Sequence, residues 1–550
     1  MDKTDVEELS ERYYAFMDDF AQNVFEDSKL LGKYYTDYTV ASRMADLVCA
    51  AFCRENNVSE SLSVIDPFCG DGRLILCFLK SWEKSGRPWP KHLSVSVWDI
   101  DCDAVATARK RIVGRCREAG VECDINAHCS DAFVAFSDTE GQYDICVTNP
   151  PWGLLKPQKT LSRHADKETM KEYKRALEEY DSYISAAFPT SRPLRKFGRW
   201  GTNLARCGTE LALRLVHENG IAGIVSPASL FSDTISEVFR KWLFSNFEVD
   251  TITYYPPELK LYGNADISSV TFVARRSVRG TNESLEVISY SDYSTCENEK
   301  VAGEDFAYLR SSGFNVPLVN TATTISILRK LDALPTLQEY CQQTGLCFVR
   351  ELDETRVKEK LLPSGNIKFA KGYMVDRYSF VGDSLYLDVR QVAPPVSCFR
   401  NKVVWRDVSR DSQTRRMKAT LLSPGFICGN SLGVIYGDDV QLPYLKMVLA
   451  FMDSLIYEYQ ARSKLVSNHV SAGIVKQIRV PDIGIDDELV RLVDLALNGK
   501  DVQREIEVEV ALLYGVDPHD FEVIVSSFSL GQDDQKDLID SYSKRFVQGE

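Results

Sequence analysis

The stretch Asn149-Pro150-Pro151-Trp152 follows an apolar strand pattern over residues 143–147 and contains groups that could take part in chemistry. Two consecutive prolines remove two backbone donors and restrict φ, which excludes both strand and helix at this point. Open α/β sheets bind their ligands at the carboxyl ends of strands. The Asn149 oxygen, the Pro150 carbonyl and the Trp152 ring would offer a planar substrate with an exocyclic amine two acceptors and a stacking face. Taken alone, the tetrapeptide also fits a turn with a buried Trp.

An acidic turn that contains glycine lies upstream of this stretch. A short strand pattern over 63–65 leads into Asp66-Pro67-Phe68-Cys69-Gly70-Asp71-Gly72, and an apolar helix pattern follows over 74–79. Glycines in such a turn let the backbone approach a ligand closely. The spacing is neither Gly-x-Gly-x-x-Gly nor a phosphate loop with Lys-Ser/Thr, so NAD and ATP are disfavoured. A carboxylate at Asp66 suits a ligand with a positively charged end.

Acidic residues also follow the next two predicted strands. The strand pattern over 93–98 ends at Asp99, and a shorter one over 124–127 precedes Asp131. Asp99 is placed to accept from ribose hydroxyls, and Asp131 could accept from an adenine amino group. Either residue alone is more often a helix N-cap. Together with the glycine turn, however, they predict a cofactor site at the carboxyl edge of a sheet.

The composition is typical of a soluble globular protein, because 44% of the 550 residues are hydrophobic and 26% are charged. A chain of this length predicts two to four domains. The sequence lacks an apolar run of about 18 residues and begins with an acidic, polar segment, so we expect no membrane span and no signal peptide. The net charge of −14 argues against a uniformly basic surface but leaves room for a local basic face that binds nucleic acid.

The 15 cysteines contain no Cys-x-x-Cys pair, and the six histidines do not cluster with them. This pattern predicts a reducing, cytoplasmic compartment and no zinc or other metal site. Cys69, Cys77, Cys102 and Cys146 lie in or beside apolar patterns and are predicted to be small core residues.

The motif order resembles that of the gamma-class, S-adenosylmethionine-dependent DNA methyltransferases that methylate amino groups. The motifs are Gly32-Lys33-Tyr34-Tyr35-Thr36, the glycine turn over 66–72, Asp99, Asp131 and Asn149-Pro150-Pro151-Trp152. In particular, they look like those of the adenine-specific modification enzymes of type IIS restriction–modification systems. The resemblance implies an α/β fold with a seven-stranded Rossmann-like methyltransferase sheet, followed by a mixed, β-rich target-recognition domain and a helical C-terminal cap.

The resemblance also implies S-adenosyl-L-methionine as the cofactor. The cofactor-binding residues would be Tyr35, Thr36, Asp66, Phe68, Gly70, Gly72, Asp99 and Asp131, and the catalytic residues Asn149, Pro150, Pro151 and Trp152. One departure from the family pattern follows Thr36, where this sequence has Asp37 and many gamma-class relatives have Pro. Hydrogen bonds from adenine N6 to Asn149 and Pro150 would favour a pyramidal amine, while Trp152 stacks on the flipped base. Methylation of a cytosine carbon is not expected, because the sequence lacks a Pro-Cys nucleophile.

The predicted domains are a catalytic domain over 1–280 with a polar, DNA-facing insertion at about 155–200, a linker over 281–335, a target-recognition domain over 336–483 and a helical segment over 484–550. Basic residues are concentrated in the insertion and in a window from Phe399 to Ala419. Such residues could contact phosphates and base edges, although they also fit a solvated surface. The predicted DNA-binding residues are Arg195, Lys196, Arg199, Arg400, Lys402, Arg406, Arg410, Gln413, Arg415 and Arg416.

The expected function is site-specific methylation of adenine N6 in double-stranded DNA by base flipping, as the modification arm of a restriction–modification (phage defence) system. Expected partners are double-stranded DNA with a specific recognition sequence and a separately encoded restriction endonuclease, since we find no convincing nuclease motif. A cytosine-N4 DNA methyltransferase, an RNA N-methyltransferase and a catalytically silent DNA-recognition subunit remain alternatives.

Overall fold

The computed structural model describes residues 3–24, 35–55, 60–157, 166–192, 201–262, 267–277, 282–410, 413–465 and 468–549. The chain forms two compact units, Met1–Ala322 and Thr323–Glu550. Within the described residues, every helix is too short or too polar to cross a bilayer.

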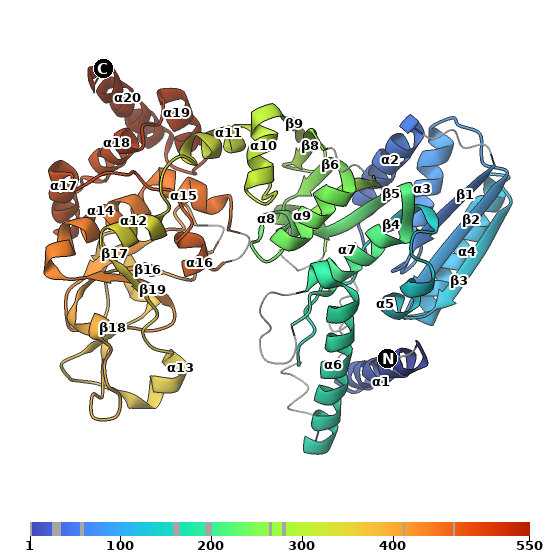
Figure 1. Cartoon of the computed structure of the whole chain (residues 1–550), viewed down its shortest axis with the longest axis horizontal. Coiled ribbons are helices and arrows are strands. Elements are labelled where there is room, and N and C mark those ends of the chain that lie inside the picture. The colour runs from blue at the N-terminus through green and yellow to red at the C-terminus, as the bar shows by residue number, and fades with distance from the viewer. Residues whose placement is uncertain are drawn as a thin grey trace. The chain divides into compact units, whose positions relative to one another are not determined.

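A nine-stranded sheet with the order β3-β2-β1-β4-β5-β7-β6-β8-β9 forms the centre of the first unit (Figure 1). β1 pairs in parallel with β2 on one side and with β4 on the other, so the chain order reverses between β1 and β4. The loops that follow these two strands meet at this switch point, where open sheets bind ligands. The strands are β1 Ser61–Asp66, β2 His92–Asp99, β3 Cys123–Cys129, β4 Tyr143–Thr148, β5 Val216–Pro227, β6 Phe247–Tyr255, β7 Ser269–Arg276, β8 Ser284–Tyr290 and β9 Cys296–Ala302.

The helices of the first unit cover the sheet because their apolar faces pack on strands that are buried on both sides. Val48 of α2 and Phe78 and Trp82 of α3 belong to this core. The helices are α1 Lys3–Val24, α2 Tyr38–Glu55, α3 Arg73–Lys84, α4 Cys102–Glu118, α5 Ala132–Ala135, α6 Lys167–Ala187, α7 Leu204–Leu215, α8 Ser229–Ser232, α9 Glu237–Asn246 and α10 Gly303–Ser311, while α11 Thr321–Leu331 crosses the boundary between the units.

The predicted α/β fold is confirmed, but the sheet has nine strands rather than seven. The two additional strands, β8 and β9, lie with α10 in the region 281–335 that was predicted to be a linker. β8 alternates between buried and half-buried residues, whereas β9 is an edge strand and is largely exposed. The polar composition of this region therefore comes from the edge of the sheet.

The second unit contains small sheets surrounded by helices. Its strands are β10 Cys347–Val349, β11 Leu361–Leu362, β12 Lys368–Ala370, β13 Val375–Asp376, β14 Ser379–Phe380, β15 Leu385–Leu387, β16 Asn401–Arg406, β17 Ala419–Leu422, β18 Phe426–Cys428 and β19 Leu432–Gly437. Its helices are α12 Leu337–Gln343, α13 Glu354–Val357, α14 Leu442–Asp453, α15 Leu455–Arg462, α16 Ala472–Val475, α17 Asp487–Leu497, α18 Gln503–Tyr514, α19 Pro518–Ser526 and α20 Gln532–Gly549. The C-terminal helices α17–α20 share one hydrophobic core with α14 and α15.

Candidate active site

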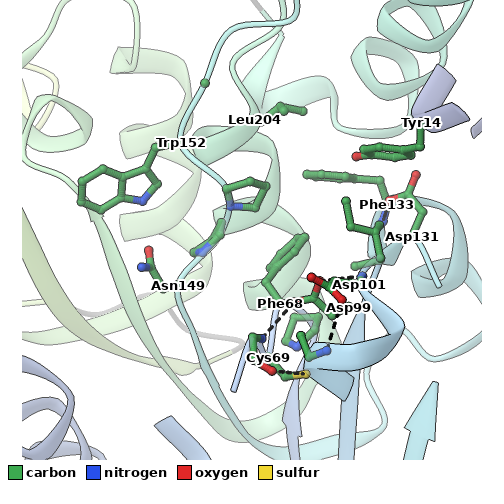
Figure 2. Close-up of a pocket in the computed structure, with 18 of the residues that line it drawn as sticks. Tyr14, Phe68, Cys69, Asp99, Asp101, Asp131, Phe133, Asn149, Trp152 and Leu204 are labelled. Carbon is green, nitrogen blue, oxygen red and sulfur yellow. Dashed lines mark hydrogen bonds between the residues drawn. The ribbon is translucent and has the colours of Figure 1, made fainter. Parts of the chain in front are cut away.

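A cavity of about 340 Å³ lies at the switch point between β1 and β4. Most of the predicted site residues line it: Tyr35, Thr36, Phe68, Gly70, Asp99, Asp131, Asn149, Pro150, Pro151 and Trp152. In Figure 2, Asn149 and Trp152 lie at one end and Asp131, Phe133 and Tyr14 at the other, with Phe68 between them. The cavity therefore has an amide and an indole at one end and carboxylates with aromatic rings at the other.

The side chain of Asn149 is oriented by a contact from far along the chain. Its Nδ2 donates to Oγ1 of Thr36 at 3.0 Å, and Thr36 is buried. Because Nδ2 faces Thr36, the amide oxygen Oδ1 points to the other side. Thr36, which was predicted to bind the cofactor, thus also positions the predicted catalytic residue.

The diproline corner sits directly against helix α7. A Cβ added at Gly208 of α7 would lie 2.5 Å from Cβ of Pro150 and 3.2 Å from the ring of Phe68. Only glycine permits this close approach. Trp152 packs against the ring of Tyr262, with ring centroids 4.6 Å apart. The rigid loop predicted from the two prolines is therefore supported on both sides.

The carboxylate of Asp99 is held by two backbone donors. The N–H of Gly70 donates to Oδ2 at 2.9 Å, and the N–H of Asp101 donates to Oδ1 at 3.0 Å. Gly70 has a φ of 48°, and a Cβ there would lie 3.1 Å from the ring of Tyr35. The glycine turn therefore approaches the end of β2 closely and aligns a carboxylate at the cavity, where it can accept from hydroxyl groups.

Two predicted cofactor-binding residues, Asp66 and Gly72, are not among the residues that line the cavity, and both have structural roles beside it. Asp66 is fully buried and accepts from Oγ1 of Thr148 at 2.7 Å, which ties the ends of β1 and β4 together. Burial raises the pKa of Asp66 to about 7, and hydrogen bonds from Thr148 and the backbone of Phe68 oppose this rise. Gly72 has a φ of 77° and packs on Ala108, so it serves the packing of α3 against α4.

Sequence reasoning assigned no role to Arg73. Its guanidinium forms a two-point contact with Asp71 at 2.9 Å and donates to the backbone carbonyl of Thr36 at 2.5 Å. It also lies over the ring of Tyr35 at 4.9 Å. Arg73 thereby fastens the Tyr35–Thr36 segment to the glycine turn. Burial lowers the pKa of Arg73, but the hydrogen bond and charge of Asp71 outweigh this and raise it.

Helix α1 supplies part of the cavity wall, which sequence reasoning also missed. Its contributions are Tyr13, Tyr14 and Met17, and other lining residues that were not predicted include Asp101, Phe133 and Leu204. In the first 30 residues, Leu9, Tyr13, Phe16, Phe20 and Val24 recur at a spacing that predicts a helix. Nothing local in the sequence shows which surface that helix covers. Asp101, in the sequence Asp99-Ile100-Asp101, shares the acidic strand end that predicted acceptors for ribose hydroxyls, although only Asp99 was named as a site residue.

The prediction that Cys102 is a small core residue is wrong. Cys102 and Cys129 are exposed and form a disulfide, with Cα atoms 5.0 Å apart. They are 27 residues apart in sequence and stand at the start of α4 and the end of β3. The two cysteines lie too far apart in sequence for a local spacing pattern to link them.

Three of the predicted DNA-binding residues are buried in the second unit, so their assignment is wrong. Lys402 is inaccessible and pairs with Glu351 at 2.5 Å, and Arg415 pairs with Glu458 at 2.8 Å. Arg416 is also buried. The charges of Lys402 and Arg415 are neutralised by these acids, and Nη2 of Arg416 donates to the carbonyl of Ser409 at 3.3 Å. Buried in this way, the three side chains cannot reach phosphate groups.

The remaining predicted DNA-binding residues differ in their environment. Arg406 donates to the backbone carbonyls of Gly372 and Val375. Arg400 forms a surface ion pair with Asp438 at 2.8 Å, Oε1 of Gln413 accepts from Ser409, and Arg410 is exposed. Arg195, Lys196 and Arg199 lie outside the described residues, as do Gly32, Lys33 and Tyr34.

The order of the sheet and the acidic cavity at its switch point define an α/β protein with a ligand site at the carboxyl ends of its parallel strands. Residues 4–180 match the family model described as N-6 DNA Methylase. The matched residues include every predicted catalytic and cofactor-binding residue.

One relative, the type II methyltransferase M.VspI of Vibrio sp. (strain 343), is 31% identical over 135 residues, or 24% of this chain. The alignment spans only 29% of the relative's length. Among solved structures, the type IIG restriction endonuclease BpuSI is 14% identical with a TM-score of 0.43, covering 96% of this chain and 67% of that chain. A nuclease-deletion mutant of the type ISP restriction-modification enzyme LlaGI, solved with a DNA substrate mimic, is 11% identical with a TM-score of 0.49, covering 88% and 56%. These structural similarities are too low to support a conclusion about activity.

Proposed function

We propose that the chain methylates adenine N6 in double-stranded DNA at a specific sequence, with S-adenosylmethionine as the methyl donor and the target base flipped out of the helix. The observation that carries this proposal is the place of Asn149. Its amide, held by Thr36, opens onto the same cavity as the carboxylates of Asp99 and Asp131. The N-6 DNA methylase domain over residues 4–180 supports the same reaction.

The cavity residues fit the proposed cofactor. Asp99, aligned by two backbone donors, would accept from the ribose hydroxyls, and Asp131 would accept from the adenine amino group. Phe68 and Phe133 supply an apolar wall for a flat ring, and the absence of a side chain at Gly70 leaves room beside Tyr35. When bound, the cofactor supplies an electrophilic methyl group on a sulfonium.

The other end of the cavity would hold the substrate base. Asn149 Oδ1 and the Pro150 carbonyl would accept the two N6 protons, which favours a pyramidal nitrogen with its lone pair directed at the methyl group. Trp152 would stack on the extruded base and offset part of the few kcal/mol that flipping costs. Since the two prolines fix the backbone, these groups need little rearrangement when the base arrives.

We place sequence recognition in the second unit, with a separately encoded endonuclease completing a restriction–modification system. Arg400 and Arg410 are the cations of the basic window that reach solvent most openly. They are candidates for phosphate contacts, because such contacts need accessible positive charge.

Transfer of labelled methyl groups to plasmid DNA, RNA and protein tests the substrate class. We expect incorporation into DNA and N6-methyladenine in the digest; incorporation into RNA or protein alone would reject the proposal, and N4-methylcytosine would correct the base. Asn149→Ala is expected to lower the transfer rate at least about 10²-fold, as does loss of a preorganised hydrogen-bonding group. The variant should still bind S-adenosylhomocysteine, and the exposed Asn126→Ala serves as the matched control with normal transfer.

A further inference from the structure

Helices α1 and α6 pack against each other beside the adenine end of the proposed cofactor site. The rings of Tyr13 and Tyr180 are stacked, with centroids 4.7 Å apart and an angle of 16°. The hydroxyl of Tyr14 lies 3.3 Å from that of Tyr180. Because α6 belongs to the insertion after the diproline corner, the buried face of that insertion docks on α1. In Figure 1 the two helices lie together below the sheet.

Donors from both helices converge on Asp131. Ser10 Oγ of α1 donates to Oδ2 at 2.6 Å, and the Tyr180 hydroxyl of α6 donates to the same oxygen at 2.7 Å. The other oxygen, Oδ1, accepts from the N–H of Phe133 at 3.0 Å. Neither Ser10 nor Tyr180 lines the cavity, whereas Asp131 does. The two hydroxyls therefore sit behind the carboxylate and fix its plane.

The same hydroxyls also influence the charge of the carboxylate. Burial raises the pKa of Asp131, and the hydrogen bonds from Ser10, Tyr180 and the Phe133 backbone lower it. Loss of either hydroxyl would remove one of the hydrogen bonds that lower the pKa of Asp131. The pKa would then rise, which favours the protonated form of this residue. A protonated carboxyl group can no longer offer both oxygens as acceptors.

We propose that Ser10 and Tyr180 are positioning residues that hold Asp131 as an oriented acceptor for the exocyclic amino group of the cofactor's adenine. Helices α1 and α6 then form a clamp around this end of the cavity, whose wall α1 completes with Tyr14 and Met17. The inference rests on the proposed function, because it presupposes an adenosyl cofactor. It adds that recognition of the adenine ring depends on the N-terminal helix, whose Ser10 lies 121 residues before Asp131 in sequence.

Two ligands separate this role from simple support of the fold. S-adenosylhomocysteine carries the amino group, and S-inosylhomocysteine carries a carbonyl oxygen in its place. We expect the wild type to prefer the adenosyl ligand by at least about tenfold in Kd, since a hydrogen bond to a charged group is typically worth that much. In Tyr180→Phe the ratio of the two Kd values should fall about tenfold, chiefly because the adenosyl ligand binds less tightly.

Tyr183→Phe is the matched control, because its hydroxyl comes from the same helix but donates to the carbonyl of Phe133 at 3.1 Å. This variant should keep the wild-type ratio. Ser10→Ala, which removes only one hydroxyl, provides a second test with an expected fall in the same direction.

An unchanged ratio in both Tyr180→Phe and Ser10→Ala would overturn the inference, as would an equal loss of affinity for both ligands. Wild-type protein that binds neither ligand would reject the proposed function together with this inference. Binding of both ligands without preference would reject the role of Asp131 alone and leave the methyl-transfer proposal standing.

Discussion

The sequence predicted ligand-binding charges in both units: acids for the cofactor in the first and cations for DNA in the second. In the structure the acids line a cavity, whereas several of the cations are buried. In the first unit, Asp99 is the last residue of β2, Asp131 follows the neighbouring strand β3, and both line the cavity. In the second unit, Lys402 lies within β16 and Arg415 and Arg416 lie just before β17, where all three are buried. Asp99 and Asp131 thus face the cavity at the carboxyl ends of parallel strands, although Asp66 at the end of β1 is buried. The three cations lie beside or within short strands and turn inward.

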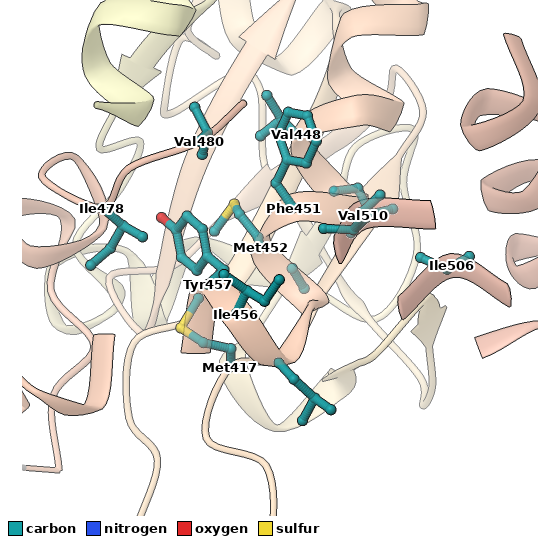
Figure 3. Close-up of a cluster of buried hydrophobic side chains, with 14 of the residues drawn as sticks. Met417, Val448, Phe451, Met452, Ile456, Tyr457, Ile478, Val480, Ile506 and Val510 are labelled. Atoms are coloured by element: carbon teal, nitrogen blue, oxygen red, sulfur yellow. The ribbon is translucent and has the colours of Figure 1, made fainter. Parts of the chain in front are cut away.

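The buried cations of the second unit have acidic partners from distant parts of the chain. Arg415 lies between Glu458 at 2.8 Å and Glu507 at 3.0 Å. Met417, two residues further on, belongs to the hydrophobic cluster that Figure 3 shows with Phe451. The window from Phe399 to Ala419 therefore contributes residues to the core of the unit as well as to its surface. The positive net charge of the window does not show that these basic residues form an exposed basic face.

Breaking one of these buried pairs tests the comparison most strongly. In Glu458→Gln, Arg415 would lose a charged partner while remaining buried, and removal of one partner of a buried pair typically costs about 3–5 kcal/mol. The expected result is a loss of that size in the free energy of unfolding, measured by urea denaturation. Burial acts to raise the pKa of Glu458, yet Arg415 and Arg462 outweigh it and lower that pKa, which is consistent with a charged carboxylate.

Arg400→Gln is the matched control for this measurement. It breaks the surface pair with Asp438, and such exposed pairs are worth about 0–1 kcal/mol. Equal losses in the two variants would contradict the distinction between buried and exposed members of the basic window.

Much of the first site could be predicted because its groups are encoded locally. The glycine turn and the diproline corner each follow a strand pattern, and parallel strands bring their ends to one edge. Asn149 and Asp99 were found in this way. The contact between Ser10 and Asp131 could not be found, because 121 residues separate the two and no periodicity links them.

The burial of the cations in the second unit could not be predicted for the same physical reason. There, three of the predicted DNA-binding residues proved to be buried. The partners of Lys402 and Arg415 are Glu351, Glu458 and Glu507, all outside the window in which charge was counted. A local count of basic residues is therefore insensitive to acids that the fold brings in from elsewhere. β8 and β9 show a related failure, since the polar sequence of an edge strand resembles that of a linker.

A second prediction concerns two buried acids, one in each unit. Burial raises the pKa values of Asp66 and Asp453 to about 7 in the folded protein. The unfolded chain would release these protons near pH 4, so between about pH 4 and pH 7 only the folded state holds them. Each acid should therefore lower the free energy of unfolding by up to about 1.4 kcal/mol per pH unit as the pH rises through this window.

The Asn variants measure this effect, because they cannot titrate. Asp66→Asn and Asp453→Asn should each flatten the dependence of unfolding free energy on pH between about 4 and 7. Asp66→Asn, unlike Asp453→Asn, should also change the affinity for S-adenosylhomocysteine, because Asp66 joins the strand ends beside the cavity through Thr148. A pH dependence that stays as steep as in the wild type would show that the acid in question ionises normally.

The smallest expected effect concerns Arg410, the exposed cation of the basic window. If it contacts a phosphate, Arg410→Ala should weaken DNA binding and reduce the slope of log affinity against log salt concentration by about 1. The free energy of unfolding should stay within about 0.5 kcal/mol of the wild type, as is usual for surface substitutions. Lys500, between α17 and α18, is also an exposed cation, and Lys500→Ala should leave the salt slope unchanged. Equal slopes for both variants and the wild type would remove Arg410 from the DNA interface, and with it the last unpaired arginine of the window that the described structure exposes.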